Sequence, residues 1–303
     1  MSVAELEAAE LTLESPTGGL WREASYRLIR NPTAIAGAVL VLIFVIAAIF
    51  ASVIAPYGPL DQNLSLLKEG GIPTGPSLHH LLGVDLLGRD VFTRILYGAR
   101  FSLLIGVVSV AIGLSVGLVL GSVAGYIGGI VDTVIMRCMD IMLAIPGLLF
   151  AIGIVALLGP GLYQIMVAVG VVNIPIFARL LRGSVLAQRE NDFVLAARAV
   201  GVRRRAILFS HILPNAISPV IVQGTLAMAT AIIDVAGLGF LGLGPQDPAT
   251  PEWGTMLTDV NDYLQAAPFL AIIPGIAIVL SVLGFNLIGD GLREALDPRL
   301  RAR

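Results

Sequence analysis

The chain of 303 residues has little charge, a single cysteine and a single lysine. Charged residues make up 13% of it, about half the share in an ordinary soluble domain, and 56% of its residues are hydrophobic. This composition disfavours a simple water-soluble fold. The one cysteine, Cys138, excludes an internal disulfide and any multi-cysteine metal or iron–sulfur site. The net charge of -2 gives no indication of a nucleic-acid partner.

Sequence patterns of catalysis and nucleotide binding are also missing. Lys68, the single lysine, lies outside any G-x-x-x-x-G-K-S/T loop, so no Walker-type ATP site is expected. A G-x-S-x-G match at residues 113–117 and a G-x-G-x-x-G match at residues 237–242 lie within or after apolar runs, not at strand-to-helix turns. His79 and His80 lack the short fixed spacings of a metal site. We therefore predict no catalytic residue, no metal ligand and no cofactor bound by this chain.

The chain does contain a series of charge-free apolar runs. At a rise of roughly 1.5 Å per residue, such runs can cross a hydrocarbon core of roughly 30 Å as helices. One long run is divided by Gly159-Pro160-Gly161, residues that break helices and form tight turns. The predicted spans cover residues 34–55, 102–124, 140–158, 162–181, 216–239 and 268–289. The sequence thus predicts an all-α integral membrane protein with six transmembrane helices.

Basic residues are distributed unevenly between the two sides of these spans. Of the 19 lysines and arginines, all except Lys68, Arg89, Arg94 and Arg100 fall on the side that holds both termini. Because basic loops face the cytoplasm, we predict that both termini are cytoplasmic. Residues 1–33 are expected to form a cytoplasmic segment with an interfacial helix on the inner leaflet of the lipid bilayer.

The loop between the last two predicted spans is acidic. It carries Asp247, Glu252, Asp259 and Asp262 and has no basic residue. We expect these carboxylates at the surface, either solvated or facing a basic docking partner.

Glycine recurs every four residues in the second predicted span, at Gly113, Gly117, Gly121 and Gly125. Such a stripe lets another backbone approach closely, which favours helix packing over exposure to lipid. We expect this packing within the chain or against a partner subunit.

Four aspartates lie within or beside the spans: Asp132, Asp140, Asp234 and Asp290. A charge in hydrocarbon is costly and usually faces a cavity or a paired group. Asp140 and Asp290 lie near the predicted cytoplasmic ends, where water can solvate them. Asp234 is the better candidate for a residue of a translocation pathway, with pairing to a partner subunit as the alternative.

Proline interrupts three predicted spans, at Pro146, Pro175 and Pro274. Each proline removes a backbone donor and allows a kink. Kinked helices around a cavity suit a transport path, to which we also assign Asn286 in the last span.

The most informative stretch is the basic loop at residues 182–215, which Gly201 divides into two amphipathic helices. By composition it can bind anionic lipid or a soluble partner. Its small residues, glycine break and terminal Leu-Pro resemble the EAA loop of ATP-binding-cassette (ABC) importer permeases, whose coupling helices dock onto the ATPase. The resemblance assigns these residues to an ATPase-coupling loop: Leu195, Ala196, Ala197, Arg198, Gly201, His211, Leu213 and Pro214. Leu195 replaces the glutamate that opens the family's motif.

Other segments are similar to the C-type subunit of dipeptide and oligopeptide permeases. They are residues 30–32, 82–92, 97–100, 240–244, 251–254, 286–290 and 296–299, and the similarity runs from about residue 20 to the C-terminus. The resemblance implies the type I ABC importer transmembrane-domain fold. It places the first transmembrane helix at 34–55, an extracytoplasmic segment at 56–96, and the permease core at 97–303 with the coupling loop 182–215.

The resemblance also implies partners in a bacterial cytoplasmic (inner) membrane. A homologous B-type permease would complete a heterodimer, ABC ATPase subunits would use ATP and Mg, and an extracytoplasmic peptide-binding protein would deliver substrate. This chain would not itself be an enzyme. The expected substrates are dipeptides or short oligopeptides, with nickel complexes or glutathione as alternatives within the family. The other classes left open are an ion-gradient-driven secondary transporter, for which no clear inverted repeat is present, and a membrane anchor for soluble enzymes.

Overall fold

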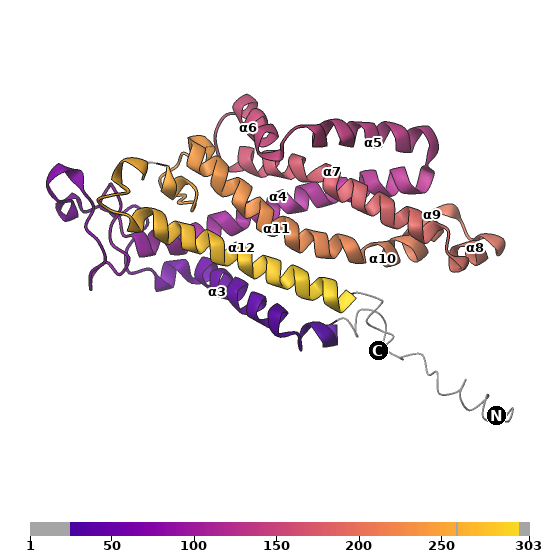
Figure 1. The fold of residues 1–303 in the computed structure, drawn as a ribbon, viewed down its shortest axis with the longest axis horizontal. Helices are drawn as coiled ribbons and strands as arrows, with labels where there is room; N and C mark the ends of the chain where they lie inside the picture. The colour runs from indigo at the N-terminus through magenta and orange to yellow at the C-terminus, as the bar shows by residue number, and fades with distance from the viewer. Residues whose placement is uncertain (1–24, 259, 297–303) are drawn as a thin grey trace, which may run out of the picture.

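The long apolar runs form helices that lie side by side in the computed structural model, which describes residues 25–258 and 260–296 (Figure 1). The longer helices are α3 (Pro32–Ile54), α4 (Val91–Ile127), α5 (Gly129–Ala144), α6 (Gly147–Leu158), α7 (Leu162–Arg189), α11 (Ser218–Leu238) and α12 (Phe269–Leu296). Short helices are η1 (Leu64–Leu66), η2 (Glu69–Gly71), α8 (Asp192–Ala199), α9 (Arg204–Ala206), η3 (Ile207–Ile212), α10 (Leu213–Ala216), η4 (Gly239–Leu243), η5 (Thr255–Leu257) and η6 (Asn261–Tyr263). Within the described ranges, extended pairing is limited to two isolated bridges. The all-α prediction is therefore confirmed.

Five of these helices are long and apolar enough to cross a membrane: α3, α4, α7, α12 and α11, which η4 continues. The sixth candidate is α5 together with α6, and this pair is bent by 93°. The bend lies at Ile145 and Pro146, which leave the helical region with ψ angles of 130° and 128°. The ring of a proline pushes the preceding residue towards extended backbone, and Pro146 has no N–H to continue the ladder. The interruption predicted at Pro146 within the span 140–158 is therefore confirmed, but it is a break of 93° between two helices and sharper than the expected kink.

Helices α4, α7 and α12 extend several residues beyond their predicted spans, and α12 continues to Leu296. α4 begins at Val91 because Asp90 caps it, its Oδ2 accepting a hydrogen bond from Thr93 N at 2.7 Å. α7 continues to Arg189, so the first part of the predicted loop 182–215 is helical. A charge-free run locates the apolar part of a helix, whereas the helix itself continues through polar turns that protrude from the membrane. Of the predicted interfacial helix, residues 1–24 lie outside the described part of the chain.

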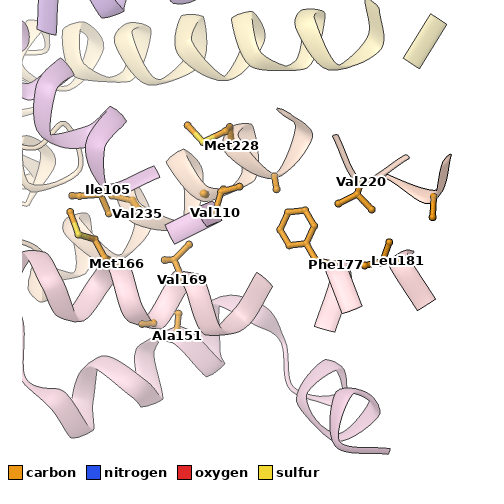
Figure 2. Close-up of a cluster of buried hydrophobic side chains, with 14 of the residues drawn as sticks. Ile105, Val110, Ala151, Met166, Val169, Phe177, Leu181, Val220, Met228 and Val235 are labelled. Atoms are coloured by element: carbon orange, nitrogen blue, oxygen red, sulfur yellow. The ribbon is translucent and has the colours of Figure 1, made fainter. Parts of the chain in front are cut away.

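The core lies where α4, α6, α7 and α11 meet (Figure 2). Figure 2 shows Ile105 and Val110 of α4, Ala151 of α6, Met166, Val169, Phe177 and Leu181 of α7, and Val220, Met228 and Val235 of α11. On the other side of the bundle α3 packs against α12, with Gly37 against Gly284 and Ala34 against Gly291. The small residues let these two backbones approach closely.

The bundle has two distinct ends. At one, which we call the α8 end, α8 to α10 lie at the same end as the first turn of α3 and the last turn of α12 (Figure 1). Asn31 Nδ2 donates to a carboxylate oxygen of Glu294 at 2.6 Å there. At the other, the Trp253 end, the segments 55–90 and 244–268 form a cap (Figure 1). The described residues thus place both chain ends of the bundle on the side of the predicted coupling loop.

Candidate functional site

α8 is a short helix with a glycine-specific ending. Gly201, two residues beyond its last residue, has φ +83°, a conformation that other residues adopt at a cost. Its N–H donates to Arg198 O at 3.0 Å, and Val202 N donates to Ala197 O at 3.0 Å. These two bonds form a Schellman motif, which satisfies carbonyls at the helix end. The glycine break in the sequence therefore corresponds to the stop of α8.

The two faces of α8 differ in what they contact. Val194 and Ala197 are buried in the chain's own core, where α8 packs on η3. Leu195 is 49% exposed, and Ala196 and Arg198 are also exposed. Val194 was not among the assigned residues, although it anchors the helix. Of the predicted coupling residues, Ala197 therefore supports α8 from inside, while its neighbours form an exposed, mainly apolar face.

The connection from α8 to α11 includes one turn of π-helix. In η3, Leu213 N donates to Leu208 O five residues back, and Pro214 follows without an N–H of its own. Ile207 and Ile212 are buried and hold this turn against the core. The remaining assigned residues lie at the surface of the same turn and of α10: His211 and Leu213 are half-buried and Pro214 is exposed. Phe209, two-thirds exposed, extends the apolar surface and was not predicted.

The glycine stripe lies at the contact between α4 and α7. Gly113, Gly117, Gly121 and Gly125 are all buried, and a Cβ added at any of them would meet α7 at 2.5 to 3.0 Å. At Gly117 the obstacle is Phe177 Cβ, at 2.5 Å. The stripe thus joins two helices of the same chain. Because α7 leads directly to α8, this contact fixes the position of the α8 end relative to the bundle.

Ion pairs join α5, the helix that precedes the bend, to α7. Arg182 donates from Nε and one terminal nitrogen to both oxygens of Asp132, at 2.7 and 2.6 Å, and Arg179 donates to Asp140 at 2.6 Å. Two of the four predicted aspartates are therefore paired within the chain. Asp234 on α11 and Asn286 on α12 are half-buried, and no hydrogen bond or ion pair joins either side chain to another described residue. Asp290 is exposed.

A buried turn closes the Trp253 end. Glu252, expected at the surface, is 1% exposed. One carboxylate oxygen accepts hydrogen bonds from Gly254 N at 2.8 Å and Ser102 Oγ at 3.2 Å, and the other accepts from Thr255 N at 2.9 Å. Burial raises the pKa of Glu252 to about 7, although these three donors act to lower it. The prediction of surface carboxylates is wrong for Glu252; Asp247 and Asp262 are exposed, and Asp259 lies outside the described residues.

The same turn contacts α3, α4 and α11, and Trp253 also clusters with Ala277 of α12. Trp253 is fully buried, its Nε1 donates to Ile95 O of α4 at 3.2 Å, and its ring meets Phe44 of α3 edge-on at 5.3 Å between centroids. Gly254 packs against the backbone of Ala236 in α11. The tryptophan in an otherwise polar loop was a signal of this burial. The turn at residues 251–257, which we call the Trp253 turn, thus ties α3, α4 and α11 together.

Histidines of the cap are engaged in local contacts. His80 Nδ1 lies 2.9 Å from Asp90 Oδ1, and the His80 ring stacks on Tyr57 at 4.8 Å. Across the described ranges, no group of three or more His, Cys, Asp or Glu side chains is placed to hold a metal ion.

Comparison with known proteins adds two family matches. Residues 117–302 match the family described as "Binding-protein-dependent transport system inner membrane component", and residues 19–69 match "N-terminal TM domain of oligopeptide transport permease C".

Curated relatives match over nearly the whole chain. A dipeptide transport system permease protein of Alkalihalophilus pseudofirmus is 48% identical over 282 residues, which cover 93% of this chain and 91% of the relative. A di/tripeptide transport system permease protein of Pseudomonas aeruginosa is 45% identical, with 96% and 95% covered. A glutathione transport system permease protein of Salmonella paratyphi A is 48% identical, with 93% and 91% covered.

Among solved structures, a chain of the inward-facing MetNI methionine ABC transporter superposes with a TM-score of 0.57 at 19% identity. The match covers 68% of this chain and 97% of that chain. The type I importer transmembrane fold predicted from the sequence is therefore confirmed.

Proposed function

Because this chain belongs to the family of binding-protein-dependent transport system inner membrane components, we propose that it moves dipeptides or short oligopeptides through an ATP-driven importer. It is a multi-pass protein of the bacterial inner membrane and a permease component of an ABC importer. Members of this family work with ATPase and permease partner subunits. The names of the dipeptide and di/tripeptide relatives, at 48% and 45% identity, support the choice of substrate.

The partners are proposed in more detail. A homologous B-type permease forms the other half of the pore, ABC ATPases bind ATP and Mg, and an extracytoplasmic peptide-binding protein delivers substrate. The α8 end then faces the cytoplasm, and the Trp253 end faces outward, in agreement with the distribution of basic residues. This chain supplies no ATPase site and no cofactor of its own.

The observation that carries the proposal is the exposed, mainly apolar face of α8, which is held on the core by its buried side. Leu195, Ala196 and Arg198 point away from the core, while Val194 and Ala197 fix the helix to η3. An apolar face left in solvent is typical of a protein contact. We assign it to the ATPase, with Leu195 contributing apolar area where the family's motif has a glutamate.

Coupling follows from the connections of α8. When the ATPase pair closes on ATP, force on α8 reaches α7 directly and α11 through η3 and α10. α4 moves with α7 because the glycine stripe locks the two together. At the far end, α4 and α11 hold the Trp253 turn, so their movement opens or closes the outer side. Shifting the ratio of inward-open to outward-open molecules from 99:1 to 1:99 requires about 5.5 kcal/mol of differential binding free energy between the two states.

Asp234 and Asn286 are proposed as pathway residues. Both are half-buried on helices of the bundle and neither is paired with a described side chain, which leaves them available to water or substrate.

Glutathione is a second candidate substrate. The relative from Salmonella paratyphi A that is named for glutathione transport is as similar as the dipeptide relative, at 48% identity. Glutathione is itself a short peptide, so one permease architecture suits both.

Co-purification tests the proposal. The tagged chain is extracted from its native membrane in mild detergent, its partners are identified, and ATPase activity is measured with binding protein loaded with a dipeptide or with glutathione. Recovery of a second permease and ATPase subunits, with activity raised most by the dipeptide-loaded protein, is expected. Stimulation by glutathione alone would transfer the proposal to the second candidate. Recovery of this chain alone would contradict both.

A further inference from the structure

A small cavity lies in the cap at the Trp253 end. Its volume is about 180 Å³. One wall comes from residues 85–94, which include the first turn of α4, and the other from Thr255, Met256, Val260 and Leu270, the last of which lies in the first turn of α12. Three of the lining residues are charged, Asp85, Arg89 and Arg94, and most of the others are apolar. The cavity thus belongs to the cap, outside the middle of the spans.

Positive charge exceeds negative charge in this cavity. Arg89 Nε donates to an oxygen of Asp85 at 2.7 Å, and Arg94 Nε lies 3.4 Å from the same oxygen. The other Asp85 oxygen accepts the backbone N–H groups of Leu87 and Arg89, both at 2.9 Å. One carboxylate therefore serves two guanidinium groups and two backbone donors.

Arg94 is left with unsatisfied donor capacity. Its side chain is only 8% exposed, and its Nη1 has no hydrogen-bond partner in the described part of the chain. The next carboxylate, Asp90, is already engaged by His80 at 2.9 Å and by Thr93 N at 2.7 Å. A guanidinium group stays charged when buried, so the free Nη1 favours a further hydrogen-bond partner in the cavity. A carboxylate suits it best, because its two oxygens match the guanidinium fork.

We propose that this cavity receives an aspartate or glutamate side chain of the extracytoplasmic binding protein, an inference that rests on the proposed function. The cavity lies between the cap and the first turns of α4 and α12, at the end of the bundle where the proposed function places such a protein. Leu87, 44% exposed, lies at its rim and offers apolar contact around the entering side chain. A carboxylate inside pairs with Arg94 and neutralises the surplus charge.

The position of the cavity gives docking a mechanical consequence. Thr255 lines the cavity, and its backbone N–H holds Glu252 at 2.9 Å. Met256, the next residue of the Trp253 turn, lines it too. A side chain that enters the cavity therefore contacts the turn that ties α3, α4 and α11. Docking acts directly on the element that closes the outer side.

The test measures docking on the assembled importer in nanodiscs. Affinity for fluorescently labelled binding protein is measured at low and high salt for the wild type, Arg94→Met, Arg94→Lys and Arg100→Met. Arg94→Met should weaken docking by a factor on the order of ten or more and reduce its salt dependence. Arg94→Lys should dock with an affinity between those of the wild type and Arg94→Met, because an ammonium group keeps the charge but cannot bind both carboxylate oxygens as a guanidinium does. Arg100 is exposed on the same helix and is the matched control, with near wild-type affinity expected.

A charge-reversal experiment covers the case in which Arg94→Met fails to assemble. Single changes of surface Asp or Glu to Arg on the binding protein are combined with Arg94→Glu, and one of them should restore docking. The inference is overturned if Arg94→Met docks like the wild type, or if no reversal rescues Arg94→Glu. It is also overturned if Arg94→Met leaves docking unchanged but reduces uptake of peptides with a free C-terminus more than uptake of amidated peptides. The carboxylate that Arg94 binds would then be that of the substrate. A wild-type importer that binds no delivery protein would instead refute the proposed function.

Discussion

Glu252 is a carboxyl group buried among backbone donors and three helices. Its carboxylate oxygens accept hydrogen bonds from two N–H groups of its own turn and from Ser102 of α4. The ionised and protonated forms of the group therefore both fit the site, but they differ in free energy. Burial disfavours the ionised form, which is why the pKa rises to about 7. The group therefore changes charge within the pH range in which bacteria live.

This pKa predicts a pH-dependent stability. A carboxyl whose pKa is higher in the folded chain than its ordinary value of 4.5 binds a proton more readily when folded. It therefore stabilises the fold at low pH. Its contribution to the free energy of unfolding, at most about 3 kcal/mol, is lost as the pH rises from about 4.5 to about 7. The Tm of the purified wild type should fall between pH 5 and pH 8, and that of Glu252→Gln should fall less. Exposed Asp262→Asn is the control and should follow the wild type. Equal slopes for wild type and Glu252→Gln would contradict this assignment.

Gly201 offers a second prediction for a single residue. Proline there has no N–H for Arg198 O and cannot adopt φ +83°, so Gly201→Pro should disrupt the end of α8 at a local cost of more than about 1 kcal/mol. The variant should insert into the membrane but hydrolyse ATP without uptake. Gly201→Asn, which tolerates the left-handed region, should retain coupling. The ratio of peptide transported to ATP hydrolysed is the measurement; a wild-type ratio in Gly201→Pro would remove the coupling role from α8.

At the scale of elements, the α4–α7 contact is the best defined. Because the glycine stripe brings the two backbones into close contact, we expect α4 and α7 to move together and α7 to transmit the movement of α8. The close approach has no room for added atoms, whereas Gly183 on α7 faces open space.

A matched pair of substitutions tests that contact. Gly117→Ala places a Cβ 2.5 Å from Phe177 Cβ, so the two helices must separate. We expect the free energy of unfolding to fall by about 1–3 kcal/mol. Gly183→Ala has nothing within 4 Å and should be neutral or stabilising by up to about 1 kcal/mol. Thermal unfolding of both purified variants measures the difference. Similar Tm values would mean that α4 and α7 are less closely packed than described.

The sequence predicts some elements well and others poorly, for physical reasons. Long apolar runs locate the spans because a membrane helix must be apolar over its whole lipid-facing length. The sharpness of the 93° bend between α5 and α6 is missed because the apolar run continues through Pro146, and composition does not distinguish a kink from a right-angled break. The burial of Glu252 is missed because one of its donors, Ser102, is 150 residues away. The Schellman end of α8 is local, and Gly201 alone predicts it.

In the whole molecule, entry of substrate from the outside requires the Trp253 end to open during transport. The turn at this end contacts α11 through Gly254 and Ala236. The residue that follows the turn, Thr258, donates from Oγ1 to Gly239 O of η4 at 3.0 Å. We propose that these contacts hold the Trp253 end closed and that transport requires their release.

A disulfide can hold this end closed. A Cβ at Gly244 would lie 3.8 Å from Thr255 Cβ, the usual spacing in a disulfide. Gly244→Cys with Thr255→Cys, in a Cys138→Ser background, should abolish uptake when oxidised and regain it on reduction. Each single cysteine variant is the control and should transport in both conditions. Undiminished uptake by the oxidised double variant would show that the turn and the end of α11 move together and that opening occurs elsewhere.

The central claim is that this chain moves its substrate with energy borrowed from ATPase partners. The most direct test is uptake of a labelled dipeptide into proteoliposomes that contain the assembled importer, with and without ATP at the ATPase side, binding protein outside, and ion gradients collapsed by ionophores. We expect uptake that requires both ATP and the binding protein and is insensitive to ionophores. Uptake by this chain alone, driven by a proton or sodium gradient without ATP, would contradict the claim.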